Sequence, residues 1–352
     1  MLRSFFFLGL HALLQMAASA ALAADTSPLP APNYTVSRSF PLGGSGGWDY
    51  LALEASGARL FVSRGDRVDV VDTVSGKLAG FIPNTAGVHG IALATALKRG
   101  FTSNGRSDTI SVFELDTLRL MQEVPISGRQ PDAILYEPQH NHIITANGGS
   151  ANLSALDAAT LQIVATVPLP GPPEFMAAEA AGTVYVNIDT EPGKLVAVDA
   201  KSLTVKATWP LPGCANPTGL ALDAVHHRLF SVCENQVMVV TDSLSGKQVA
   251  RVVIGRGPDA AAFDSDLGLA FSSNGVDGTL TVIRQETPDE YRVIATVTTQ
   301  VSARTMVLDP ATHKVYLAAA KLGETPPATE ERPHPGPSVV PNSFAVLVAQ
   351  PQ

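Results

Sequence analysis

Short apolar runs separated by turn residues recur along almost the whole chain, and residues 217–255 show the pattern most clearly. Four apolar runs lie in this stretch, at Gly219–Leu222, Arg228–Val232, Gln236–Val240 and Gln248–Val253. Runs of about four to six residues rich in Val, Leu and Phe, bounded by Asp, Asn and Gly, predict strands rather than helices. Four such strands in one continuous stretch predict an antiparallel meander, the unit of a β-propeller blade.

Six further copies of this unit align with it on the first strand and the turn that follows. The residues that open the first strand of the seven copies are Asp49, His89, Asp132, Glu174, Thr218, Asp259 and Arg304. Their spacing of about 40 to 45 residues is the period of four-stranded blades. The sequence therefore predicts an all-β fold, a seven-bladed β-propeller of four-stranded antiparallel blades. An open solenoid of repeats is the alternative, but its two ends would need capping units.

The seventh copy ends at Gln352 with only three strands, and a lone strand pattern at Tyr34–Pro41 precedes the first copy. We expect this N-terminal strand to complete the last blade and close the ring. Closure in this way removes two exposed sheet edges that would otherwise favour aggregation.

The N-terminus has the features of an export signal. A basic start is followed by an apolar run at residues 4–18 and by the small-residue pattern Ala-Leu-Ala at 21–23. We therefore expect residues 1–23 to be a signal peptide, although an uncleaved anchor is the alternative reading. Residues 24–33 form a Pro-rich leader, and residues 34–352 a single propeller domain. The mature protein is expected to be periplasmic or secreted, with no membrane span after cleavage.

Charge and composition restrict the partners of the protein. The formal net charge is −8 and no Lys/Arg cluster occurs, which argues against a general affinity for nucleic acid. Only 16% of the residues are charged, whereas Gly and Pro are plentiful, as suits many short strands joined by tight turns. We expect a monomer.

The repeats resemble the YncE-like, or YVTN-repeat, family of exported seven-bladed β-propellers. The segments that carry the resemblance are Gly128–Pro170, Pro217–Gly255, Ala303–Asp309 and Val340–Phe344. The resemblance runs from Tyr34 to the C-terminus and implies the fold, but the family shares a scaffold and no general reaction. Two departures are that the fourth copy has lost one residue in its first turn, and that Ala94 replaces the turn acid of the second copy.

The first strand of each blade lines the central channel of a propeller, so the seven residues that open these strands should surround one mouth. We call these seven residues the rim. Six of them are ionisable, and they form the predicted binding site: Asp49, His89, Asp132, Glu174, Asp259 and Arg304. Four converging carboxylates would raise one another's pKa values unless a cation or the arginine compensates.

Two interpretations of the rim remain open. In the first, the rim binds a divalent metal ion, or a polar ligand whose cationic part meets the acids and whose anionic part meets Arg304. In the second, the acids are turn residues that accept backbone N–H bonds, as Pro131-Asp132 and Pro258-Asp259 suggest. A small molecule or a protein would be the partner on this face, and no ligand set is assigned to a particular metal.

The only two cysteines, Cys214 and Cys233, lie before the first strand and at the end of the second strand of the fifth copy. An up-and-down meander brings these two points to the same face, so we expect a structural disulfide. A thiol pair for redox work or for copper is the alternative.

Two kinds of loop leave the second strands of the copies. Asn-Gly pairs follow Ser103, Ala146 and Ser273, and they predict hairpins with positive φ angles. Residues 321–342 form a much longer insertion of Pro, Glu and small residues in the last copy. This loop should emerge on the face of the rim, either as a flap over the channel mouth or as a solvated excursion.

The sequence contains no nucleophile elbow, no phosphate-binding glycine loop, no His-Glu-x-x-His and no haem-attachment cysteine pair. Our first hypothesis is therefore a protein that binds a small ligand, an ion or a partner protein at the channel face. The second is a propeller enzyme of the lactonase, lyase or dehydrogenase-subunit type, with His89 as base beside Asp132 or Glu174. The third is a purely structural interaction module.

Overall fold

Twenty-eight strands make up seven four-stranded antiparallel sheets in the part of the chain that the structure describes. The structure is a computed structural model, and it describes residues 32–329 and 335–352. The predicted signal peptide (1–23) and nearly all of the predicted leader (24–33) lie outside the described residues. Within the described ranges, no helix is long and apolar enough to cross a membrane.

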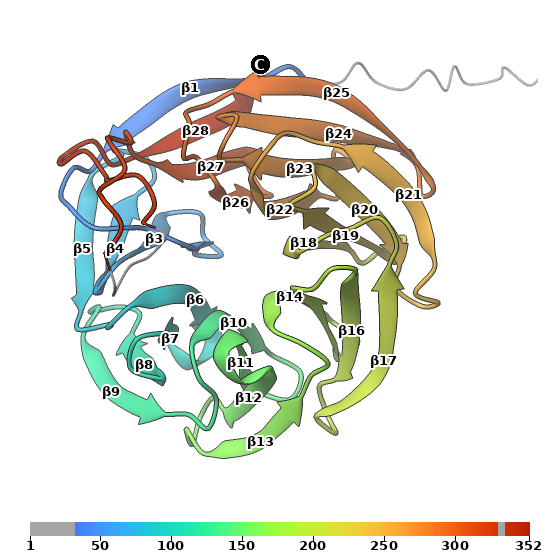
Figure 1. Cartoon of the computed structure of the whole chain (residues 1–352). Coiled ribbons are helices and arrows are strands. Elements are labelled where there is room, and N and C mark those ends of the chain that lie inside the picture. Colours follow the sequence, from blue (N-terminus) through green and yellow to red (C-terminus); the bar gives the residue numbers. More distant parts are fainter. Residues whose placement is uncertain (1–31, 330–334) are drawn as a thin grey trace, which may run out of the picture. The chain divides into compact units, whose positions relative to one another are not determined.

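The sheets are the blades of a ring, each with its first strand innermost (Figure 1). From inside to outside, the first three blades are β2 (Leu51–Leu53), β3 (Arg59–Arg64), β4 (Arg67–Asp72), β5 (Leu78–Pro83); β6 (Val88–Ala94), β7 (Arg99–Asn104), β8 (Thr109–Glu114), β9 (Leu120–Pro125); and β10 (Pro131–Glu137), β11 (His142–Asn147), β12 (Asn152–Asp157), β13 (Ile163–Pro168). The next three are β14 (Pro173–Glu179), β15 (Thr183–Ile188), β16 (Gly193–Asp199), β17 (Thr204–Leu211); β18 (Pro217–Asp223), β19 (Arg228–Cys233), β20 (Val237–Asp242), β21 (Gln248–Val253); and β22 (Pro258–Asp264), β23 (Leu269–Asn274), β24 (Thr279–Thr287), β25 (Glu290–Thr298). The short 3₁₀ turns are η1 (Thr95–Leu97) and η2 (Gly148–Ser150).

The seventh blade joins the two ends of the described chain. It contains β26 (Thr305–Asp309), β27 (Lys314–Ala319) and β28 (Ala345–Pro351), and its outer strand is β1 (Tyr34–Pro41). The β1–β28 pairing is antiparallel and runs from Tyr34 opposite Pro351 to Pro41 opposite Ala345. The predicted fold class and the predicted closure of the ring are therefore both confirmed.

The hydrophobic core is divided among the spaces between neighbouring blades. Seven clusters of buried apolar side chains fill these spaces, one between each pair of adjacent sheets. The cluster between blades seven and one contains Phe40 of the closing strand together with Leu60, Tyr316 and Phe344. Second strands such as β3 and β7 are buried on both faces and outer strands on one, so the sequence pattern is a continuous apolar run in the former and alternation in the latter.

Acidic side chains fix the turns at the ends of the strands. Asp72 accepts a hydrogen bond from Ser75 N at 2.7 Å, and Asp242 accepts one from Ser245 N at 2.8 Å. These are Asx turns, which satisfy backbone donors at the point where a strand ends. They explain why an acid recurs after the third apolar run of several copies.

The three Asn-Gly pairs behave differently from the prediction. Asn104, Asn147 and Asn274 are buried and do not have positive φ; Asn147 has φ −110°. Asn104 accepts a hydrogen bond from Thr102 and donates to Thr109 and Ser111 on the third strand. The prediction of positive-φ hairpins was wrong because buried hydroxyl partners hold these amides in the extended strand.

The long loop of the last blade begins and ends as a short antiparallel ladder. Leu322 and Val339 form an isolated bridge, and Asn342 exchanges hydrogen bonds with Gly44, in the link that leads from β1 to the rim. The loop therefore emerges on the face of the rim, as predicted. Its described residues do not line the rim cavity, so the flap over the channel mouth remains a prediction.

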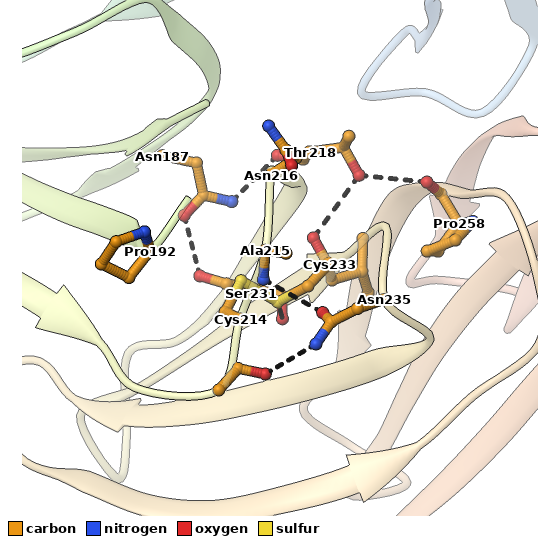
Figure 2. The surroundings of a disulfide bond; sticks show 12 residues. Asn187, Pro192, Cys214, Ala215, Asn216, Thr218, Ser231, Cys233, Asn235 and Pro258 are labelled. Carbon is orange, nitrogen blue, oxygen red and sulfur yellow. Dashed lines mark hydrogen bonds between the residues drawn. A yellow bond between two sulfur atoms is a disulfide. The ribbon is translucent and has the colours of Figure 1, made fainter. Parts of the chain in front are cut away.

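The two cysteines form the predicted disulfide, and their Cα atoms lie 5.4 Å apart (Figure 2). Both residues are buried, which excludes an accessible thiol pair. Asn235 strengthens the same corner, because its side chain accepts from Ala215 N at 3.0 Å and donates to Gly213 O at 3.0 Å. The disulfide thus joins the link before blade five to the end of that blade's second strand, β19.

Removal of this disulfide should lower stability without changing the fold. The sequence separation of Cys214 and Cys233 is 19 residues, and a loop of that size corresponds to about 3 kcal/mol. We expect the double Cys→Ala variant to unfold at lower urea concentration with an unchanged circular dichroism spectrum. An unchanged urea midpoint would contradict a stabilising role.

Candidate functional site

All seven rim residues line a single cavity of about 330 Å³ at the mouth of the central channel. The structure thus brings together every residue that the sequence pattern placed there. Each lies at the start of the innermost strand of a different blade, or one or two residues before it in the case of Arg304 and Asp49. Figure 1 shows the inner position of β6, β10, β14, β18, β22 and β26.

Hydrogen bonds from the second strand of one blade hold the rim residue of the next. Ser103 Oγ donates to the backbone carbonyl of Asp132, and Ser273 Oγ donates in the same way to Arg304. In blade four, Asn187 Nδ2 donates to Thr218 O at 2.9 Å (Figure 2). These donors are buried, so the rim backbone is fixed by polar contacts that water does not weaken.

His89 lies between two carboxylates. Its Nδ1 is 2.6 Å from Asp49 Oδ2 and 3.6 Å from Asp132 Oδ1, the second distance being too long for a hydrogen bond. The hydrogen bond to Asp49 raises the pKa of His89, with a smaller contribution from Asp132. Gly105 leaves room for the imidazole, because a Cβ there would stand 2.8 Å from the ring.

Arg304 neutralises the opposite part of the rim. Its Nη1 is 2.7 Å from Asp259 Oδ2, and its Nη2 is 3.6 Å from Asp49 Oδ1. The same Nη2 donates to the carbonyl of Trp48 at 3.3 Å. Arg304 therefore pairs with the protein's own acids, while 45% of its side chain remains exposed.

The cavity holds more negative charge than these two cationic side chains balance. Burial and the neighbouring acids raise the pKa of Asp132 to about 7 and that of Glu174 to about 8. Burial also raises the pKa of Asp259 to about 6, although Arg304 opposes the shift. Glu174 has no hydrogen-bond or ion-pair partner among the described residues. A cation entering the cavity would meet carboxyl groups that are otherwise partly protonated.

Three rim residues have the arrangement of a metal site. One ligand atom each of Asp49, His89 and Asp132 lie within 4.8 Å of one another. Asp132 Oδ1 is buried and has no hydrogen-bond partner. Imidazole and carboxylate are suitable ligands for divalent ions such as Zn²⁺ and Mn²⁺. The donor set therefore fits a divalent cation, with Asp132 as the least satisfied donor.

Three residues that line the rim cavity were not predicted from the sequence: Tyr50, Phe175 and Glu234. Tyr50 and Phe175 each follow a rim residue, and their rings stack with centroids 5.1 Å apart. Burial and the rim carboxylates raise the pKa of Tyr50 well above its usual value. Glu234, after Cys233, adds a fifth carboxyl group to the lining. An aromatic residue directly after a rim acid is the signal that could have identified Tyr50 and Phe175.

The comparisons with known proteins identify the architecture. No protein-family model matches the chain, and no curated protein matches it. Among solved structures, the hydrazine synthase of Kuenenia stuttgartiensis is similar over 78% of this chain and 92% of that chain, with TM-score 0.70 and 16% identity. The structure of U3-55K has TM-score 0.74 and 10% identity over 90% of this chain and 98% of that chain. The WD40 repeats of RRP9 have TM-score 0.73 and 10% identity over 91% and 99% of the two chains.

Fold and comparisons together define the class of protein, which is a seven-bladed β-propeller. At 10% to 16% identity, these structures show the fold alone.

The raised pKa values predict that the metal-free protein loses stability as pH rises from about 5 to about 8. Unfolded carboxyl groups have pKa values near 4, whereas those of Asp132, Glu174 and Asp259 are about 7, 8 and 6 in the folded state. The folded state therefore holds extra protons in this window, and the stability linked to them is lost as pH rises through the folded pKa values. The raised pKa of His89 acts in the same direction.

Thermal unfolding in a chelator at several pH values would measure this slope. Glu174→Gln should flatten it, whereas Asp116→Asn, on the exposed Lys98–Asp116 pair, should leave it unchanged. A slope equal in all three proteins would show that the rim is not its source.

Proposed function

We propose that the protein is an exported, monomeric β-propeller that binds a divalent metal ion at the rim. The observation that carries the proposal is the group Asp49, His89 and Asp132, in which a buried carboxylate oxygen of Asp132 has no hydrogen-bond partner among the described residues. Burial, and after it the charge of the neighbouring acids, raises the pKa values of Asp132 and Glu174, and a bound cation would stabilise their charged forms.

Export and family membership belong to the same proposal. The buried disulfide supports an oxidising compartment, because such bonds are rare in the cytosol. The apolar run and the Ala-Leu-Ala pattern near the N-terminus support a cleaved signal and a periplasmic or secreted protein. The repeat segments that resemble the YncE-like family support membership of that family.

Calorimetric titration of the mature protein with Zn²⁺, Mn²⁺ and Ca²⁺ tests metal binding. We expect one ion per chain, and a loss of affinity of about tenfold or more in Asp132→Asn, equivalent to about 1.4 kcal/mol. Asp116→Asn is the matched control, since it removes one carboxylate charge from an exposed pair and should bind as the wild type does. The absence of saturable heat for all three ions would remove the metal from the proposal.

A second candidate, a hydrolytic or lyase activity, rests on the Asp49–His89 pair at 2.6 Å. A carboxylate that orients an imidazole is a frequent arrangement in general acid–base catalysis. The raised pKa of His89 favours the protonated imidazole, and so a general acid more than the general base expected from the sequence.

Hydrolysis of an aryl lactone such as dihydrocoumarin, followed by absorbance, tests this candidate. If the pair is catalytic, His89→Gln should abolish turnover while its unfolding midpoint stays close to that of the wild type. Turnover that persists in His89→Gln, or that is absent from the wild type, would count against a lactonase.

A further inference from the structure

A second cavity, of about 510 Å³, lies where the closing strand of the ring meets blade one. The chain leaves β1 through a glycine-rich link, Gly43–Gly47, which we call the seam link. The cavity lies between this link and the loops of blade one, and three arginines line it: Arg64, Arg67 and Arg106. None of the three is a rim residue. The charged residues of this cavity are mainly arginines, whereas those of the rim cavity are mainly acids.

Arg64 is a buried cation that forms no ion pair with the described residues, although the charge of Asp69 partly opposes the effect of its burial. Only 3% of the residue is exposed, and no carboxylate of the described residues forms an ion pair with it. Its Nη2 donates to the carbonyls of Gly43 and Ser45 at 3.3 and 3.1 Å, but Nε and Nη1 have no partner. Burying an unpaired charge is costly, and burial lowers the pKa of Arg64 to about 10. Packing of the guanidinium on the Phe344 ring, 3.6 Å from its centroid, offsets only part of that cost.

Two guanidinium groups converge on one small space. A Cβ built on Gly44 would lie 3.5 Å from Nη2 of Arg64 and 3.5 Å from Nη2 of Arg67. Arg64 ends β3 and Arg67 begins β4, so a tight hairpin fixes both relative to each other. The space between them is open because residue 44 carries no side chain.

The nearby acids do not balance the arginines. Arg67 is paired with Asp69 at 2.6 Å, and Arg106 with Asp66 at 3.0 Å. The second pair is about two-thirds exposed on both sides, and such a surface pair holds its partners weakly. Three arginines therefore face two aspartates, and the unmatched positive charge is the buried one.

We propose that this pocket is a binding site for a small oxyanion, which Arg64 and Arg67 hold over Gly44. Guanidinium groups bind the oxygens of phosphate, sulfate and carboxylate through short, charge-assisted hydrogen bonds. An anion at this position supplies the missing counter-ion of Arg64, and Arg106 can turn from Asp66 to a third oxygen. The proposal is independent of metal binding at the rim.

Two glycines offer a matched pair of variants, Gly44 in the seam link and Gly268 in the turn between β22 and β23. Both have positive φ, 78° and 61°, so a new side chain is strained at either position. A Cβ at Gly44 faces the two arginines, whereas a Cβ at Gly268 would meet only Gln285 O, at 3.8 Å, and Gly268 does not line the cavity. Gly44→Asp therefore places a carboxylate in the space proposed for the anion, and Gly268→Asp adds the same charge and a similar strain outside it.

The experiment is a calorimetric titration with sodium phosphate, sodium sulfate and sodium acetate at constant ionic strength. We expect saturable binding to the wild type and to Gly268→Asp, and a loss of affinity of at least about tenfold in Gly44→Asp. A preference for phosphate and sulfate over acetate would indicate a tetrahedral anion, and the reverse a carboxylate ligand. In anion-free buffer, Gly44→Asp should also melt at a higher temperature than Gly268→Asp, because it provides the counter-charge itself.

Arg64→Met tests the same site directly, although loss of its contacts with Gly43 and Ser45 is expected to weaken folding. The glycine pair keeps the proposal testable if that variant does not fold. No saturable binding to the wild type, or equal affinity in Gly44→Asp and Gly268→Asp, would overturn the site and leave Arg64 as a structural support of the seam link.

Discussion

The pairing of β1 with β28 is the constraint on which the rest of the molecule depends. It joins residues 34–41 to residues 345–351 and completes the one blade that the C-terminal repeat leaves with three strands. It also brings Phe40 into the core between blades seven and one. The channel mouth takes one side chain from every blade, so the rim has its geometry only when the ring is closed.

The concentration of carboxyl groups around the rim cavity destabilises the folded state. Five carboxyl groups share a cavity with one arginine and one histidine, and three of the acids have pKa values raised to between about 6 and 8. Groups with such strongly perturbed pKa values occur mainly at functional sites. The buried Ser103, Asn187 and Ser273 keep the rim backbone in place despite the repulsion.

Most of the fold could be predicted from the sequence because propeller blades are local structures. Each blade is a continuous meander, so the period of the apolar runs determines the strands, the number of blades and the rim positions. The disulfide was predictable for the same reason, since Cys214 and Cys233 lie within one unit and its link.

Features that depend on side-chain contacts between strands or between blades could not be predicted. The amide of Asn104 was interpreted from its neighbour Gly105, whereas its conformation depends on hydroxyl groups of the next strand. The stacking of Tyr50 on Phe175 joins blades one and four across the channel, and no local pattern contains it. The isolation of Arg64 is a property of its surroundings, which include Phe344 from the opposite end of the sequence.

The position of the closing strand has a consequence for the order of assembly. During synthesis β1 is made first, but its partner β28 follows about 300 residues later. Until then a growing chain is an open arc with an unpaired strand at its beginning and an incomplete blade at its end, which is the kind of species that chaperones protect. Because pairing over such a sequence distance is slow, closure of the ring by β1 and β28 is expected to be a late step in folding. A chain that ends before Ala345 has no β28 and would therefore lack the step that converts an arc into a ring.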